Sequence, residues 1–319
     1  MNVAHPSSED VRVATSRTRS PNDTKVSEYI TQHGTDGIGH QLLGMYSCML
    51  LPLLDDRWVY VKKEFIGTSG HRSSNNTRRL VDALQRGSQE RPASADVRQV
   101  DNCFKSVQIL CTKHPRECIR AKWTLTQRLA KNFADFTSTQ RSLRSEHGSN
   151  LILHVRGGDR EELLRLHWEK YPPLIRFISE QIDIRSLEIL CEYESEAQVI
   201  RDELIPRVNE AAPHISVTVT SDGDPVASWS KMVHSKVLIL GPSSFSVSAA
   251  SLRVRPTFAT ERRPIGGRYD DNVLPCAVTL EELNSSTPVF FDLHHGTTQE
   301  ECVENALLTS RLGYLSEGY

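Results

Sequence analysis

The pattern of apolar and polar positions is most regular in the second half of the chain. Short apolar runs predict strands over 151–155, 187–191, 214–220, 236–240 and 256–259. Segments of helical length and periodicity lie between them, over 172–184, 195–208, 224–234 and 244–252. A strand that is apolar at every position is typical of a sheet covered on both faces. Strands that alternate with helices therefore predict βαβ units and a Rossmann-like parallel sheet.

The first half shows a looser version of the same alternation. An extended segment around 26–31 leads through the glycine-rich turn 33–41 into a nearly all-apolar stretch of helical length, 42–54. The pattern then predicts a strand over 57–65, a surface helix over 74–86, a loop over 87–100, and one long helix or two in sequence over 116–146. This order indicates a second α/β unit.

We therefore expect an α/β protein with two Rossmann-like domains that face each other across a cleft. Residues 1–24 have the polar composition of a mobile tail. An N-terminal α/β domain that carries the glycine-rich turn follows over 25–148. A C-terminal domain, a parallel sheet with flanking helices, spans 149–319.

Composition and charge narrow the class of partner. Apolar residues make up 38% of the chain and charged residues 24%, as in an ordinary soluble globular protein. The formal net charge of −2 gives no broad field that would attract nucleic acid or an acidic membrane. No stretch approaches the ~18 consecutive apolar residues of a membrane span. We expect neither a nucleic-acid partner nor a membrane span, so any bound anion must be held by a local site.

The seven cysteines show no short paired spacing, so a metal site is not expected. The odd number argues against a complete disulfide framework, and the usage favours a reducing compartment. Cys48 and Cys191 lie in apolar runs, where cysteine behaves as a small hydrophobe. A bridge among Cys103, Cys111 and Cys118 stays open.

A first candidate segment, His154-Val155-Arg156-Gly157-Gly158-Asp159, closes the strand at 151–155. Ligands of open parallel sheets bind at the carboxyl ends of the strands. A guanidinium placed there can bind a diphosphate through two hydrogen bonds, and two glycines let the backbone approach it closely. The alternative is a strand that ends in an ordinary charged turn.

A second candidate segment is Ser221-Asp222-Gly223-Asp224-Pro225, after the strand at 214–220. Its Asp-Gly-Asp triplet matches the pattern by which one class of glycosyltransferase holds a divalent metal. Asp followed by Pro is also a strong helix-start signal, with Asp as N-cap and Pro in the first turn. We favour capping by Asp224, which leaves Asp222 for a ligand.

A third candidate segment, Gly241-Pro242-Ser243-Ser244-Phe245-Ser246, joins a buried strand to a helix. Small hydroxyl residues at a helix N-terminus offer hydroxyls and free amides to a phosphate. The alternative is a serine N-cap followed by a core phenylalanine.

Taken in order, these segments resemble the superfamily of GDP-fucose-dependent α1,2-, α1,6- and protein O-fucosyltransferases. The family has a Gly-x-Gly-x-Gln-type loop, seen here as Gly37-Ile38-Gly39-His40-Gln41. It has an H-x-R-R-G-D-like motif at a strand end, seen here as 154–159. Its third block, an acidic residue followed by a helix, a buried strand and a Ser-Ser-Phe-Ser cluster, corresponds to 221–252. The resemblance covers about residues 30–255.

The resemblance implies a GT-B fold, with the donor bound by the C-terminal domain, and an inverting, metal-independent transfer without a cofactor. Arg156 corresponds to the arginine that neutralises the departing diphosphate. His154 and Asp222 correspond to contacts with guanine and ribose. Ser243, Ser244, Phe245 and Ser246 correspond to the phosphate- and nucleoside-binding loop, and Gly37, Gly39, His40 and Gln41 approach the donor from the other domain.

This chain departs from the family pattern at two positions. The usual second arginine is Gly157, and His40 stands where many members have a small polar residue. The base is open: Asp159, Glu161 and Glu162 follow the arginine and are within reach of an acceptor hydroxyl, or are plain surface charges.

The expected function is transfer of fucose from GDP-fucose to a hydroxyl of a glycan or glycoprotein, with Arg156, Asp159 and Glu161 as the catalytic candidates. The alternatives are a transferase of the same fold with another nucleotide sugar, and a sugar- or nucleotide-binding relative that has lost catalysis. Two locations are compatible with the sequence: a cytoplasmic chain as given, or a Golgi-type enzyme that lacks its anchor.

Overall fold

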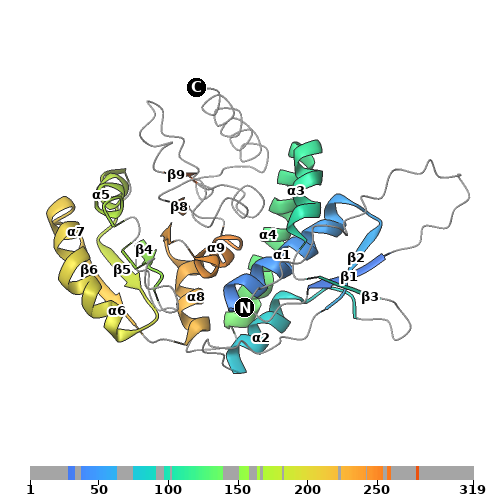
Figure 1. The fold of residues 1–319 in the computed structure, drawn as a ribbon, viewed down its shortest axis with the longest axis horizontal. Helices are drawn as coiled ribbons and strands as arrows, with labels where there is room; N and C mark the ends of the chain where they lie inside the picture. The colour runs from blue at the N-terminus through green and yellow to red at the C-terminus, as the bar shows by residue number, and fades with distance from the viewer. Residues whose placement is uncertain are drawn as a thin grey trace, which may run out of the picture.

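The structure is a computed structural model of an α/β protein with parallel sheets and flanking helices (Figure 1). It describes residues 28–32, 37–62, 75–90, 97–100, 103–138, 151–157, 164–165, 168–181, 183–221, 224–241, 243–253, 257–259 and 278–279. Among the helices of this part of the chain, none combines the length and the apolar character needed to cross a bilayer.

A six-stranded parallel sheet organises the second half of the chain. Its spatial order is β6-β5-β4-β7-β8-β9. The strands are β4 (Leu151–His154), β5 (Ser186–Leu190), β6 (Ser216–Thr220), β7 (Val237–Leu240), β8 (Thr257–Ala259) and β9 (Val278–Thr279). The chain runs outward from β4 through β5 to β6, then returns to the other side of β4 with β7 and continues to β9. Strand order therefore reverses between β4 and β7, at the centre of the sheet.

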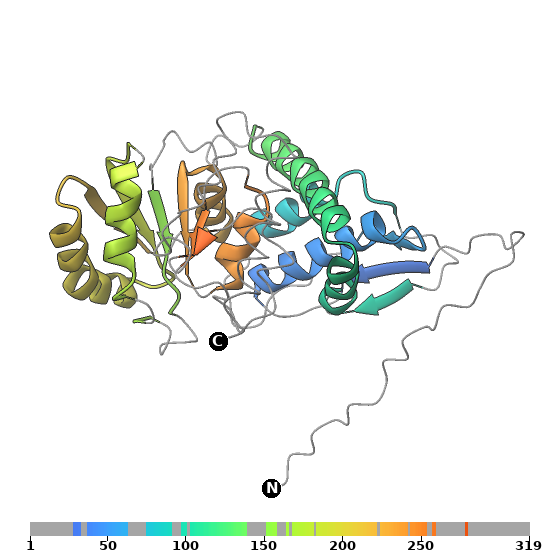
Figure 2. The same cartoon turned by 90° about the horizontal axis from the view of Figure 1, so that it is seen from above.

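Both faces of this sheet are covered, as the continuous apolar strands predict. Side chains alternate along β4: Leu151 and Leu153 lie in one core, and Ile152 lies in the other. The first face packs against α5 (Tyr171–Gln181) and the helical segment 194–211, and the second packs against α8 (Pro225–His234) and α9 (Ser244–Ala250). In Figures 1 and 2, α8 and α9 lie between the sheet and α1.

The helix expected over 195–208 forms, with a local widening in its middle. It consists of α6 (Glu194–Val199), a π-helical turn (Ile200–Leu204) and α7 (Ile205–Ala211). Pro206 lies in the first turn of α7. Proline has no N–H to donate, and its ring clashes with the carbonyl four residues earlier, so the preceding turn widens.

The first half contains a three-stranded parallel sheet in the order β2-β1-β3. Its strands are β1 (Glu28–Gln32), β2 (Trp58–Tyr60) and β3 (Val97–Val100), and α1 (Ile38–Leu54) and α2 (Asn75–Leu84) follow β1 and β2. The prediction of a loop over 87–100 was wrong at its end. Val97 is the buried residue of β3, and the backbone pairs with β1 from Tyr29↔Val97 onward.

The long helix expected over 116–146 is α4 (Pro115–Ser138), and its predicted end lies outside the described residues. A separate helix before it, α3 (Phe104–Lys113), was not predicted. His114 separates the two helices, and Pro115 occupies the first position of α4, where its missing N–H costs nothing.

One apolar core joins the two halves. It combines residues of α1, α2 and α4 with residues of α8, α9 and one face of the large sheet. The Phe133 ring of α4 meets the Trp229 ring of α8 edge-on, with centroids 5.0 Å apart, and Thr126 Oγ1 donates to the Ser251 carbonyl over 2.9 Å. This core contains residues from both sides of the predicted boundary at 148/149. The division into two domains stays a prediction.

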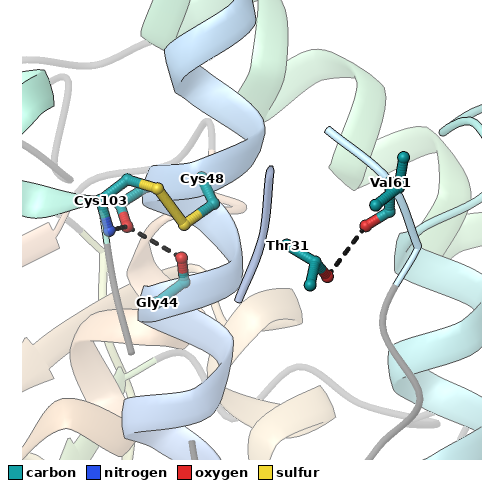
Figure 3. Close-up of a disulfide and its surroundings, with 6 residues drawn as sticks. Thr31, Gly44, Cys48, Val61 and Cys103 are labelled. Atoms are coloured by element: carbon teal, nitrogen blue, oxygen red, sulfur yellow. Dashed lines mark hydrogen bonds between the residues drawn. A yellow bond between two sulfur atoms is a disulfide. The ribbon is translucent and has the colours of Figure 1, made fainter. Parts of the chain in front are cut away.

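Two disulfides fasten α3 to its neighbours. Cys48 of α1 is bonded to Cys103, with a Cα–Cα separation of 4.9 Å (Figure 3). Cys111 is bonded to Cys118, with a Cα–Cα separation of 5.0 Å. The Cys103 amide donates to Ser47 Oγ over 3.0 Å, and that hydroxyl donates to the Gly44 carbonyl over 2.8 Å.

The cysteine interpretation is corrected accordingly. Cys48 is not a free small hydrophobe, although Cys191 is a free buried thiol. The pairing that the sequence left open among three cysteines forms between Cys111 and Cys118. Disulfides are rare in reducing compartments. The two bridges therefore count against the reducing compartment that the cysteine usage favoured.

We expect the double substitution Cys48→Ala/Cys103→Ala to lower the free energy of unfolding by about 2–4 kcal/mol, because the bridge closes a long loop in the unfolded chain. Urea unfolding under non-reducing conditions measures this change. Cys191→Ala is the matched control for loss of a buried sulfur, with an expected cost of about 1 kcal/mol. Equal losses in the two proteins would contradict a stabilising bridge.

Candidate functional site

The candidate site lies where strand order reverses, at the carboxyl ends of β4 and β7. Ligands of open α/β sheets bind in the crevice at such a point. The strand ends are very close here: a Cβ added to Gly241, just after β7, would lie 3.1 Å from the His154 carbonyl carbon and closer still to its oxygen. Only glycine fits at 241, so β7 ends directly beside the backbone of His154.

His154, the last residue of β4, carries a neutral imidazole. Burial, and to a smaller extent the charge of Arg156, lower the pKa of His154 from 6.5 to about 4. Its Nδ1 is buried and has no hydrogen-bond partner. The ring lies 5.6 Å from the Phe245 ring, centroid to centroid. The site therefore contains a buried ring nitrogen without a hydrogen-bond partner among the described residues.

Arg156 is half-buried and stands just beyond β4. The sheet ladder continues one residue past the strand, because the Val155 amide donates to the Leu190 carbonyl over 2.9 Å. Gly157 follows and is buried against Glu196 of α6. The structure thus holds the backbone on both sides of Arg156.

The hydroxyls of Ser243 and Ser246 serve the loop itself. Ser243 is the N-cap of α9, and its Oγ accepts from the Phe245 amide over 3.2 Å. The Ser246 hydroxyl is within hydrogen-bonding distance of the Gly241 and Ser243 carbonyls, at 3.2 and 3.0 Å. Both side chains are buried, whereas Ser244 and Phe245 are half-buried. Ser244 and Phe245 are the members of this cluster that keep exposed surface for a donor.

The glycine-rich turn reaches this loop from the other half of the chain. α1 begins at Ile38, four residues earlier than the apolar pattern predicts, with Gly37 as an N-cap that makes no side-chain capping bond. A Cβ on Gly39 would lie 2.5 Å from Phe245 Cα and 2.6 Å from the Ser244 carbonyl carbon. His40 is half-buried and Gln41 is buried. Gly39 therefore lies directly against the first turn of α9.

The Asp-Gly-Asp segment is only partly described. Asp222 lies outside the described residues, and the Ser221 hydroxyl before it donates to Glu194. Asp224 caps α8, as predicted: Oδ1 accepts from the Val226 amide over 3.1 Å. Its Oδ2 accepts from Asn76 Nδ2 over 2.7 Å. Both carboxylate oxygens of Asp224 are engaged, so the capping interpretation holds for this residue.

The base candidates Asp159 and Glu161 lie outside the described residues, as does Glu162. Within the described part of the chain, no three His, Cys, Asp or Glu side chains are grouped to hold a metal ion. Sequence reasoning named Gly241 only as the first residue of the third segment, without a role for its missing side chain, and it missed Glu196. A glycine directly after an apolar strand was the available signal for the first. A glutamate at the third position of a helix that follows a strand was the signal for the second.

Comparison with known proteins gives a similarity of fold to solved structures, and no more. No protein-family model and no curated protein matches the chain. Among solved structures, a mutant of FUT1 from Arabidopsis thaliana in complex with GDP is similar with a TM-score of 0.41 and 12% sequence identity. The match covers 76% of this chain and 72% of that one. The likeness concerns the overall fold.

We expect Gly39→Ala to destabilise the protein by about 2 kcal/mol or more, because a methyl group at 39 overlaps backbone atoms of α9 that cannot rotate away. Thermal and urea unfolding measure the loss. Gly87→Ala is the control: nothing lies within 4 Å of its added Cβ, and only the strain of its φ of 80° remains, about 1 kcal/mol. A Gly39→Ala protein as stable as the control would refute the close approach.

The buried neutral His154 predicts a pH dependence of stability. Its pKa is lower in the folded chain, about 4 against 6.5, so the unfolded chain binds more protons between these values. The protonation of His154 in the unfolded chain therefore lowers the free energy of unfolding as the pH falls from 6.5 towards 4. We expect His154→Phe to lose less stability than wild type between pH 7 and pH 4.5, as measured by urea unfolding. His214→Gln, at an exposed histidine, should match wild type; identical pH dependence in all three proteins would contradict the buried neutral imidazole.

Proposed function

We propose that the crevice between β4 and β7 binds the diphosphate of a nucleotide sugar, and that the chain transfers the sugar to a hydroxyl of a glycan or glycoprotein. The observation that carries this proposal is the convergence of three segments that are far apart in the chain. Gly39 contacts the turn at Phe245, and the Phe245 ring lies beside the His154 ring at a tilt of 58°. These are the segments in which the family resemblance lies.

Arg156 supplies the electrostatic part of the reaction. When the bond between the sugar C1 and the diphosphate breaks, negative charge grows on the phosphate oxygen that leaves. A cation held at the edge of the crevice stabilises that charge without further reorganisation. The positive N-terminal end of α1, whose N-cap Gly37 makes no side-chain capping bond, adds a favourable dipole for an anion.

GDP-fucose is the proposed donor, on the strength of the motif resemblance, and the transfer is inverting and needs no metal. The acceptor oxygen attacks C1 from the face opposite the diphosphate, and a carboxylate takes the proton of the hydroxyl. Asp159 and Glu161 remain the candidates for this base. His154 and Ser244 are suited to the nucleoside and phosphate, because both lie on the crevice with polar atoms.

A second function is a nucleotide- or sugar-binding protein without turnover. Position 157 favours this alternative, because the buried carboxylate of Glu196 lies where the family's second arginine would project. Among the described residues of this turn, Arg156 is then the one that carries a positive charge. A transferase that uses a different nucleotide sugar is a third function compatible with the same geometry.

The test is consumption of GDP-fucose, GDP-mannose and UDP-sugars by wild type and Arg156→Ala, together with GDP affinity by calorimetry. We expect turnover with a GDP-sugar, a loss in kcat of about 100-fold or more in the variant, and a smaller loss of GDP affinity, because the charge matters most in the transition state. Arg156→Lys should recover part of the rate. Arg176→Ala, at an exposed arginine paired with Glu180, is the matched control.

The outcomes separate the three functions. Turnover with UDP-sugars alone would overturn the GDP assignment. GDP binding without consumption of any donor, whatever glycan is offered, would favour the binding protein. Equal kcat in wild type and Arg156→Ala would refute the role of the arginine.

A further inference from the structure

Glu196 is a buried carboxylate at the edge of the candidate site. It lies in the first turn of α6, just after β5, and is 6% exposed. Its Oε2 accepts from the Glu192 amide over 2.9 Å and from the Tyr193 amide over 3.2 Å. The side chain therefore holds the connection between β5 and α6 in place.

The same carboxylate closes the space over Gly157. A Cβ at position 157 would lie 2.7 Å from Glu196 Cδ and 3.2 Å from its Cγ, and closer still to Oε1. β4 and β5 are neighbours that pair up to His154↔Leu190. One side chain thus spans the ends of two adjacent strands, with one oxygen on the β5 loop and the other against the β4 loop.

We propose that Glu196 is a positioning residue for Arg156, acting through Gly157. Val155 is held by the bond of its amide to Leu190, and Gly157 is packed against Glu196. Arg156 lies between these two points, so the origin of its side chain is constrained on both sides. A preorganised cation stabilises developing charge only if it is held in place, and a displacement of about 1 Å can cost two orders of magnitude in rate.

The contact between Glu196 and Gly157 also explains why position 157 carries no side chain. A side chain at 157 would require the carboxyl end of Glu196 to shift, and that carboxylate accepts from two backbone amides where it lies now. We infer that position 157 contributes no second cation to the diphosphate site, because the carboxylate of Glu196 lies over Gly157. The identity of the ligand as a diphosphate rests on the proposed function, whereas the positioning of Arg156 by Glu196 and Gly157 does not.

The experiment follows Arg156 directly. The rate at which phenylglyoxal modifies Arg156 is measured by mass spectrometry on its peptide, in the ligand-free protein and below the unfolding range of every variant. We expect Glu196→Ala to change this rate by about threefold or more, because the turn is released. Glu196→Gln keeps the length and an oxygen acceptor, and should stay within about twofold of wild type. Glu180→Ala, an exposed glutamate of α5, is the matched control.

A double-mutant cycle tests the link to Gly157. Gly157→Ala should also change the rate at Arg156, and Gly157→Ala/Glu196→Ala should resemble Glu196→Ala instead of adding both effects. With a donor that wild type consumes, Glu196→Ala should lower kcat by about tenfold or more with a smaller change in KM.

The results distinguish positioning from simple capping of α6. An unchanged rate at Arg156 in Glu196→Ala, with only a lower Tm, would overturn the proposal, as would additive effects in the cycle. If wild type consumes no donor and binds no GDP, the proposed function fails, and the modification rates still decide whether Glu196 positions Arg156.

Discussion

The first turns of α1 and α9 meet with no room for a side chain between them, and the candidate site depends on this contact. Gly39 lies against the backbone at Ser244 and Phe245, so the two halves of the chain approach each other at the candidate site. The contact places Phe245 beside the His154 ring. α1 can be held this closely because nearly its whole surface is buried. Further along the same helix, the bond between Cys48 and Cys103 fixes α1 to α3.

The edge of the large sheet is built by the same means, with glycine wherever a neighbouring group already fills the space. The backbone of His154 occupies the space where a side chain at position 241 would lie, and the carboxylate of Glu196 occupies that space at position 157. Electrostatics follow from this packing. Burial and the nearby guanidinium lower the pKa of His154 to about 4, so the imidazole is neutral at physiological pH. Within the described part of this turn, residues 155–157, the positive charge therefore resides on Arg156.

The local pattern of apolar residues predicted the elements in which successive side chains are all buried. β4 and β7 are apolar at successive positions because both faces of the sheet are covered there. The strands β4 to β8 were each expected within a few residues of their places, whereas β9 was not predicted. The strand β3 was missed because Val97 is its one fully buried side chain and its backbone pairing with β1 carries the structure. The helix α3 was missed as well. Its attachment depends on a bond between Cys103 and a cysteine 55 positions away.

By itself, the sequence determined the alternation of strands and helices, the cap of α8 by Asp224 and the three candidate segments. These are properties of neighbouring residues, set by periodicity, backbone preference and capping. The tertiary structure decided that the hydroxyls of Ser243 and Ser246 bond within their own loop. It also decided that Asp224 receives a second bond from Asn76, and that Glu196 fills the space over Gly157. Such contacts join residues far apart in the chain, and no local pattern encodes them, because they arise only when packed elements bring two backbones to within a side chain's reach.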